Sequence, residues 1–313
     1  AKVRCDGCKT PCILGLSRFA WWVFRTGGFV FRRVLAAALF VFAGSVAEAR
    51  PYNDVQIYDP NDAESEWLTA SEYKQLILEL GLIVSPRVMS PSSTLGFNGF
   101  DVGFEANTTL IHGTEPYWTK GTKDGSIPRV FTVPTLRVRK GLPLSLEGGM
   151  NVSYLPFTGQ QVLGGDFRFA VHEGFSLVPD VAIQVSYNQY IGNEQLDMNV
   201  KQGSATLGYT WAFGEVPGIH TGRVSAWSGF AKGYIDSKIN KGGLNSIATF
   251  RNDFLDDSDG DGIGVNASEE QTTSFNKWVL GVQVESGGFT YLVNTEFVDS
   301  GVPSINMRWG AQF

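Results

Sequence analysis

The residues best suited to binding a ligand form one acidic segment, Asp257-Ser258-Asp259-Gly260-Asp261-Gly262. Its carboxylates occupy alternate positions and its last glycine permits a sharp turn, so the carboxylates can converge on one hard cation. More acidic residues flank the segment on both sides: Asp253, Asp256, Glu269 and Glu270. The aspartates therefore predict a calcium site. The alternative is an acidic loop that is merely solvated, as glycine-rich acidic runs often are.

Over its six residues the segment resembles the calcium loops of EF-hand proteins and of thrombospondin type 3 repeats. Ser268 stands where an EF-hand has its bidentate glutamate, and the sequence shows no flanking helices. Glu269 or Glu270 could replace that ligand only in a shifted loop. The resemblance implies calcium as a cofactor, and we predict no other cofactor.

Three cysteines near the start of the chain have the spacing of a metal or redox cluster: Cys5, Cys8 and Cys12. They precede Phe29–Ala49, which has a basic pair, an apolar run and an Ala47-Glu48-Ala49 cleavage pattern, the parts of a secretory signal. The apolar run is too short for a membrane-spanning helix. We therefore predict that residues 1–49 are an upstream extension plus a signal peptide, that translation starts near Val30, and that cleavage removes the cysteines.

Enzyme chemistry has few candidate groups in this sequence. Such chemistry needs a general base, usually histidine, near a nucleophile, or a pair of carboxylates. The chain has three histidines, His112, His172 and His220, and no G-x-S-x-G, HExxH or P-loop motif. The topology predicted below leaves His112 alone on the outer side. We predict that the protein is not an enzyme, and an outer-rim hydrolase is the alternative of this class.

The composition indicates strands rather than helices. At 313 residues, with 43% hydrophobic and 18% charged residues, the chain is neither a disordered nor a helical membrane protein. Its 37 glycines, 22 phenylalanines, 10 tyrosines and 8 tryptophans suit a strand-rich fold with aromatic girdles. The net charge of -6 argues against a nucleic-acid partner.

Apolar and polar residues alternate in about ten segments, the pattern of strands with two different faces. In the last segment, Ile305, Met307, Trp309, Ala311 and Phe313 alternate with polar residues or glycine. Each segment is near the length that crosses a bilayer when tilted. The segments lie near residues 100–110, 130–138, 144–154, 167–171, 181–187, 205–213, 224–230, 278–284, 289–297 and 305–313.

The seventh of these segments is the least regular, because Trp227 falls on its polar face. A register slip there, or an extra hairpin within 241–250, would give about twelve strands instead of about ten. We expect the fold to deviate from the alternation at Trp227 first.

The connections between segments form two sets. The shorter set comprises 140–143, 172–180, 214–220 and 286–288. The other set includes the longest connections, 113–127 and 236–273. Short turns on one side, longer loops on the other, an even number of strands and a terminal phenylalanine resemble bacterial outer-membrane β-barrels of the small porin-like or OmpA-like type. The resemblance covers Leu95–Phe313.

The resemblance implies an all-β fold, a transmembrane antiparallel up-and-down β-barrel in the outer membrane of a Gram-negative envelope. The connection 236–273 would then be a long external loop that carries the calcium segment. In that family the barrel-assembly machinery recognises the closing strand, which here contains Trp309 and ends at Phe313. The expected partners are outer-membrane lipid, this machinery and a surface ligand.

Residues 50–94 lack this alternation. We expect a short amphipathic helix over 71–80, with Ser71 as its N-cap and Gly81 as its end. We interpret 50–94 as a periplasmic lead-in that plugs or caps one end of the barrel. A loosely ordered tail is the alternative.

The polar faces of the segments carry charges of both signs: Asp101, Glu105, Arg137, Arg139, Glu147, Asp166, Arg168, Arg223, Glu285, Glu296 and Arg308. A barrel of about eight to ten strands has an interior only about wide enough for its own side chains. Opposite charges in that space should pair across the lumen, because a buried charge is costly when it is unpaired. This favours a filled lumen over a selectivity filter.

Three functions follow from this barrel. The first is porin-like passage of ions or small solutes. The second is a closed-lumen structural or adhesion barrel that displays a calcium-binding outer loop, and the third is the outer-rim hydrolase. Fold alone does not decide among them, because barrel function is determined by the lumen and the loops.

Overall fold

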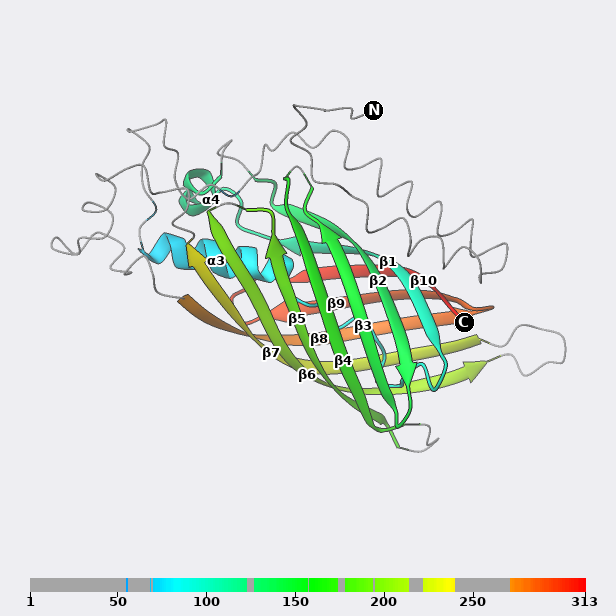
Figure 1. The fold of residues 1–313 in the computed structure, drawn as a ribbon. Helices are drawn as coiled ribbons and strands as arrows, with labels where there is room; N and C mark the ends of the chain where they lie inside the picture. The colour runs from blue at the N-terminus through cyan, green and yellow to red at the C-terminus, as the bar shows by residue number, and fades with distance from the viewer. Residues whose placement is uncertain are drawn as a thin grey trace, which may run out of the picture. The chain divides into compact units, whose positions relative to one another are not determined.

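The computed structural model describes Val55, Leu68 and residues 70–122, 127–156, 158–173, 178–193, 195–213, 222–239 and 271–313. These residues belong to one compact unit, Arg50–Phe313. Ten antiparallel strands close into a barrel in the order β1-β10-β9-β8-β7-β6-β5-β4-β3-β2, so each strand pairs with its neighbours in the chain (Figure 1). The predicted fold class, an up-and-down antiparallel barrel of ten strands with a helix before it, is confirmed.

The strands are β1 (Phe100–Leu110), β2 (Val130–Leu142), β3 (Leu146–Tyr154), β4 (Gln161–His172), β5 (Asp180–Ile191), β6 (Leu196–Phe213), β7 (Gly222–Ile239), β8 (Gln271–Ser286), β9 (Phe289–Val298) and β10 (Ser304–Gln312). Among the described residues two helices accompany the strands, α3 (Ala70–Val84) before the barrel and α4 (Pro116–Lys120) between β1 and β2. Within the described residues, no helix combines the length and the apolar character needed to cross a bilayer.

The barrel closes where the first strand meets the last. Glu105 lies opposite Arg308 in the β1–β10 register. The main chains of Phe100 and Phe313 exchange two hydrogen bonds, of 3.0 and 2.8 Å. The terminal phenylalanine therefore holds the seam at the start of β1.

The side chains alternate between two faces along every strand, with apolar groups outward and polar groups inward, except near the long loops, where apolar groups also face inward. Trp211, Trp278, Tyr291 and Trp309 are among the large apolar side chains exposed on the outer surface. Most buried strand residues are polar or charged. This is the reverse of a soluble barrel, whose apolar side chains fill the interior.

Trp227 lies on the inner face of β7 and is 4% exposed. Its ring covers Gly281 on the neighbouring strand, where an added Cβ would lie 2.2 Å from the ring. The β6–β7 pairing runs without a shift from Gly222 to Ile239, so the tryptophan causes no register slip. The hairpin considered for 241–250 lies outside the described residues.

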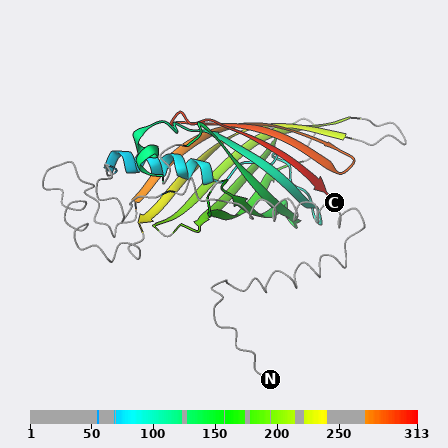
Figure 2. The same cartoon turned by 90° about the horizontal axis from the view of Figure 1, so that it is seen from above.

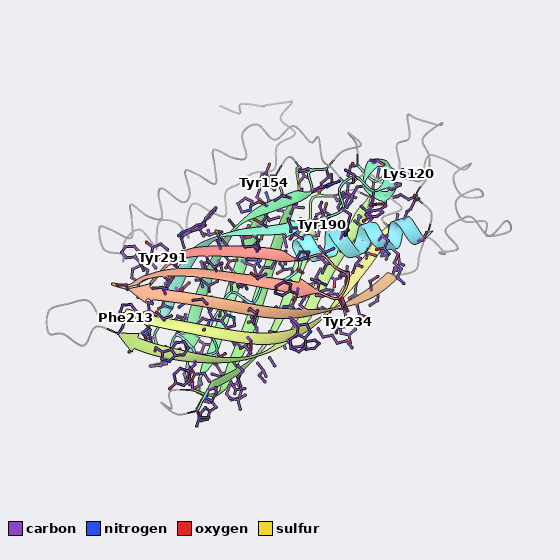
Figure 3. All side chains as sticks on the ribbon, turned by 180° about the vertical axis from the view of Figure 1, so that it is seen from behind. Lys120, Tyr154, Tyr190, Phe213, Tyr234 and Tyr291 are labelled. Atoms are coloured by element: carbon purple, nitrogen blue, oxygen red, sulfur yellow. The ribbon has the colours of Figure 1, made fainter. Side chains whose placement is uncertain are left out.

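The connections gather at two ends of the barrel. The strand ends that 143–145, 173–179, 214–221 and 287–288 connect lie at the short-turn end, and those that 111–129, 155–160, 192–195, 240–270 and 299–303 connect lie at the long-loop end. In Figure 3, Phe213 and Tyr291 lie at the short-turn end, while Lys120 and Tyr234 lie at the long-loop end. The two sets predicted from the sequence are therefore on opposite ends.

Helix α3 lies at the long-loop end, opposite the carboxy-terminus (Figures 1 and 2). From Val84 the chain continues as residues 85–95, which we call the threaded segment. Val84 O accepts a hydrogen bond from Asn188 near the long-loop end of β5, and Leu95 N donates to Glu147 at the short-turn end of β3. The threaded segment therefore passes once through the lumen before β1 begins.

One expectation for this region is wrong. The helix does not end at Gly81 but continues to Val84, and the glycine instead permits a close approach of the helix backbone to the Ile235 side chain, which an added Cβ would meet at 2.4 Å. The helix lies at the long-loop end. Its apolar face packs on inward-facing apolar residues at the long-loop end. Which end faces the periplasm stays a prediction.

Candidate functional site

The lumen is the candidate functional site, and its two halves differ in chemistry. In the half near the long loops, α3 inserts Leu76, Ile77 and Leu80 into one apolar cluster. The barrel wall contributes inward-facing residues of six strands to the same cluster: Phe131, Val133, Val162, Tyr190, Val200, Ile235 and Phe275. This half is closed in the way that a soluble protein fills its core.

The half near the short turns is charged. Glu105 accepts from Arg137 Nε at 2.7 Å, and Asp166 accepts from the same guanidinium at 2.6 Å. Arg308 pairs with Asp101 and lies 3.8 Å from Glu105. These five side chains are buried, so their charges are balanced within the protein rather than by water.

A second group of charges continues the network toward the short turns. Glu147 pairs with Arg139 at 3.0 Å and with Arg168 at 2.8 Å. Arg139 also reaches Asp101, at 3.5 Å, and so joins this group to the first. The network therefore runs along the wall through five neighbouring strands, from β4 through β3, β2 and β1 to β10.

Glu296 lies at the junction between the two halves. It accepts from Arg87 at 2.9 Å and from Lys277 at 3.1 Å. Lys277 also donates to the Ser85 hydroxyl at 2.6 Å, and its Nζ lies 5.1 Å from the centre of the Phe275 ring in the apolar half. The Glu296 carboxylate, together with Lys277, thus binds the start of the threaded segment to β8 and β9.

The structure brings eight of the eleven predicted lumen charges into the network of β4 to β10, and a ninth, Glu296, is buried in its own cluster with Arg87 and Lys277. The other two, Arg223 and Glu285, form a separate pair at 2.9 Å near the short turns, where the arginine side chain is 56% exposed. Sequence reasoning missed Lys277, although it shares the face of Gln283 on β8. It also missed Arg87, which lies outside any alternating segment and gave no signal.

The wall binds the threaded segment through both its main chain and its side chains. Asn294 donates to Val88 O at 2.8 Å, Arg308 to Met89 O at 3.2 Å, and Arg168 to Ser93 O at 2.7 Å. Arg168 also donates to Pro91 O. Its side chains are bonded as well: Arg139 donates to the Ser90 hydroxyl, and the Ser92 hydroxyl lies 3.3 Å from that of Thr206. The segment thus offers carbonyl acceptors to wall donors, and Val88 N and Leu95 N donate to the wall carboxylates of Glu296 and Glu147.

The threaded segment and α3 together close the lumen. A small cavity remains between them and the wall, lined in part by Ile83, Arg87, Asn107 and Arg137. It has room for about one water molecule. The lumen would become an open channel only if the threaded segment and α3 left it.

His112 lies at the rim of the long-loop end. Its Nδ1 is 2.6 Å from the buried carboxylate of Glu79 on α3, which also accepts from the Tyr117 hydroxyl at 2.9 Å and from Trp118 Nε1 at 2.6 Å. Burial, together with the nearby charge of Glu79, raises the pKa of Tyr117. The four residues, which we call the rim clasp, tie α3 to the β1–β2 connection. His172 ends β4 at the short-turn end, and His220 lies outside the described residues.

The other residues predicted from the sequence are those of the calcium segment, the amino-terminal extension and the closing strand. The calcium segment with its flanks and residues 1–49 lie outside the described residues. Among the described residues, no three His, Cys, Asp or Glu side chains lie together as a metal site. Trp309 is exposed on the outer face and stacks on Phe104 with ring centres 6.5 Å apart, and the Phe313 side chain is exposed.

No protein-family model and no curated protein sequence matches the chain. Among solved structures, the N-terminal β-barrel domain of Pseudomonas aeruginosa OprF is similar at 14% identity and a TM-score of 0.28, covering 70% of this chain and 99% of that one. Ail, the attachment invasion locus protein of Yersinia pestis, is similar at 9% identity and a TM-score of 0.30, covering 69% and 99%. A KdgM porin is similar at 6% identity and a TM-score of 0.31, covering 68% and 99%. These scores are too low for the likenesses to bear on function.

Proposed function

We propose that the chain is an integral β-barrel protein of the bacterial outer membrane. The observation that supports this most is the outer surface, where large apolar side chains of the ten strands are exposed while charges are buried inside. Trp278 alone is 65% exposed. Water would disfavour so continuous an apolar surface, whereas lipid would solvate it.

Within the membrane, the geometry supports a closed-lumen structural or adhesion barrel best. Both halves of the lumen are filled, one by apolar packing of α3 and the other by paired charges around the threaded segment. The barrel would then act through what its long-loop end presents, including the 236–273 connection with its predicted calcium segment. Outer-membrane lipid, the barrel-assembly machinery and a surface ligand remain the proposed partners.

Porin-like passage of ions or small solutes is the second candidate. One observation favours it: the threaded segment has no apolar core of its own along most of its length and is held by hydrogen bonds from the wall. Water could replace such bonds if the segment left. The protein would then conduct only in a second state.

We also propose that the protein is not an enzyme. In the rim clasp the His112 imidazole is held by a carboxylate that three other groups already bind, which suits a structural role. The hydrolase predicted as an alternative would need a nucleophile beside this histidine.

Conductance in a planar bilayer tests the proposal. The full chain would be produced in a Gram-negative host and purified from the outer membrane, and its folded state checked by heat-dependent migration on a gel. We expect folded protein without steady openings, with or without calcium. Steady openings of the unaltered protein would replace the closed barrel by the porin-like candidate, and a calcium effect would place the 257–262 segment near the mouth.

A further inference from the structure

The direction of the chain through the lumen has a topological consequence. Helix α3 ends at Val84 in the long-loop half, and β1 begins at Phe100 at the short-turn end. Two residues before α3 also lie at the long-loop end: Leu68 is buried in the apolar cluster, and Val55 O accepts from Asn193 at 2.8 Å. The chain therefore enters the lumen among the long loops and leaves it among the short turns.

An exported chain reaches the outer membrane from the periplasm, and outer-membrane barrels keep their short turns on that side. The residues before the threaded segment must then have crossed the membrane. We propose that this barrel is a conduit for its own amino-terminal segment, which it carries through the lumen and presents, with α3, at the cell surface. This inference rests on the proposed function.

The length of the threaded segment fits a single crossing. Residues 85–95 span at most roughly 36 to 40 Å when fully extended, at about 3.3–3.6 Å for each residue. The hydrocarbon core of a bilayer is about 30 Å thick. The segment is therefore long enough to cross once and too short to cross and return.

The wall of the charged half binds the main chain of the threaded segment at several points. Asn294, Arg308 and Arg168 donate to main-chain carbonyls of the threaded segment, which every residue possesses. From Val88 to Leu95 the segment carries no charged side chain. Donors that bind carbonyls would tolerate a series of different residues passing through, and would hold the last of them when passage stops.

The apolar half explains why the passage ends where it does. Leu76 and Ile77 are fully buried among the wall residues, and the rim clasp binds Glu79 to the β1–β2 connection. A helix anchored in this way cannot slide back toward the short turns without losing its apolar packing. What stays outside is the opposite face of α3, where Ser71, Lys74 and Gln75 are exposed.

Thiol labelling on intact cells tests the route. Three single variants of the full chain would be compared: Gln75→Cys on α3, Thr114→Cys at the long-loop end, and Leu144→Cys at the short-turn end, where the leucine is 83% exposed. A membrane-impermeant maleimide would be added before and after permeabilisation of the outer membrane. The unaltered chain serves as the blank for its own cysteines.

We expect the Gln75→Cys and Thr114→Cys variants to be labelled equally well before and after permeabilisation, and Leu144→Cys only afterwards. Labelling of Thr114→Cys but not of Gln75→Cys in intact cells would overturn the conduit and leave the outer-membrane barrel standing. Labelling of Leu144→Cys in intact cells would overturn it as well, because the short turns would face outward. No labelling of any variant before permeabilisation would instead contradict the proposed function, and the conduit with it.

Discussion

The two halves of the lumen are closed by opposite physical means. Near the long loops, α3 fills the barrel with apolar side chains, each of which contributes about 1.5–3 kcal/mol when fully buried. Near the short turns, the wall and the threaded segment are held by ion pairs and hydrogen bonds, whose gain is largely offset by desolvation. The apolar half therefore supplies stability, while the charged half is costly to leave incomplete. The comparison predicts different responses to mutation in each half.

The largest effect should come from breaking the charged half at Glu296. The Glu296→Gln variant leaves Lys277 and Arg87 buried without their carboxylate, and we expect a loss of about 3–5 kcal/mol of unfolding free energy. Chemical denaturation of the barrel in lipid measures it. The matched control is Glu285→Gln, whose partner Arg223 is half exposed, and which should cost about 0–1 kcal/mol. If both variants lost the same free energy of unfolding, burial of the ion pairs would not be the reason why breaking them is costly.

The apolar half should respond through cavity formation. Leu76→Ala removes a fully buried side chain from the cluster around α3, and we expect a loss of about 2–5 kcal/mol in the same denaturation experiment. Gln75→Ala, on the exposed face of the same helix, should change the free energy of unfolding by about 0.5 kcal/mol at most. If Leu76→Ala were as mild as this control, α3 would not be packed in the barrel mouth.

A smaller effect, measured as conductance, should follow from replacing Arg87, the one charged residue of the threaded segment. Arg87→Met removes its charged hydrogen bonds to Glu296 and Thr109, worth about 1.5–3 kcal/mol. If that energy holds the segment in place, the displaced state becomes roughly ten to a hundred times more populated. We expect this larger population of the displaced state to appear as brief channel openings in a planar bilayer.

A disulfide control separates this effect from general loosening of the barrel. In the Arg87→Met background, Ser92→Cys with Thr206→Cys would tie the segment to β6, and Thr210→Cys with Ser225→Cys would tie β6 to β7. We expect the disulfide between positions 92 and 206 to abolish the openings until a reductant is added. The disulfide between positions 210 and 225 should leave the openings unchanged. Openings that persist with the first pair would show that ions take another route.

The sequence allowed the strands of the barrel wall to be predicted, but not the arrangement of the groups that fill the lumen. Alternation identified the ten strands because a wall with lipid on one side and charges on the other repeats every second residue. The same alternation placed Asp101, Glu147 and Arg308 in the lumen and would have placed Lys277 there too. The individual ion pairs did not follow, since they join neighbouring strands and depend on the register between them.

The helix and the threaded segment were beyond such reasoning for a physical reason. Residues 85–95 have no apolar repeat, because an extended chain inside the lumen is surrounded by wall residues and has no lipid-facing side. Gly81 indicated a helix end by its type, yet its role is the close approach to Ile235, which only the packed structure shows. Local patterns thus describe the wall, while long-range contacts determine what fills it.

The smallest effect should come from the rim clasp, which links the apolar half to a surface connection. Tyr117→Phe removes one of the groups that donate to Glu79 and leaves His112 and Trp118 in place, so we expect a loss of about 1 kcal/mol near neutral pH.

The pH dependence of this variant tests the clasp more sharply than its stability. Burial and Glu79 raise the pKa of Tyr117 above that of an unfolded tyrosine, about 10. The folded state therefore keeps the proton when the unfolded state loses it, and the stabilisation is complete below pH 10 and declines as the pH rises further. Tyr73, whose pKa burial also raises, contributes equally to both proteins. The stability difference between the unaltered protein and Tyr117→Phe should therefore shrink above pH 10, and a difference that stays constant would show that the phenol of Tyr117 is not held by Glu79.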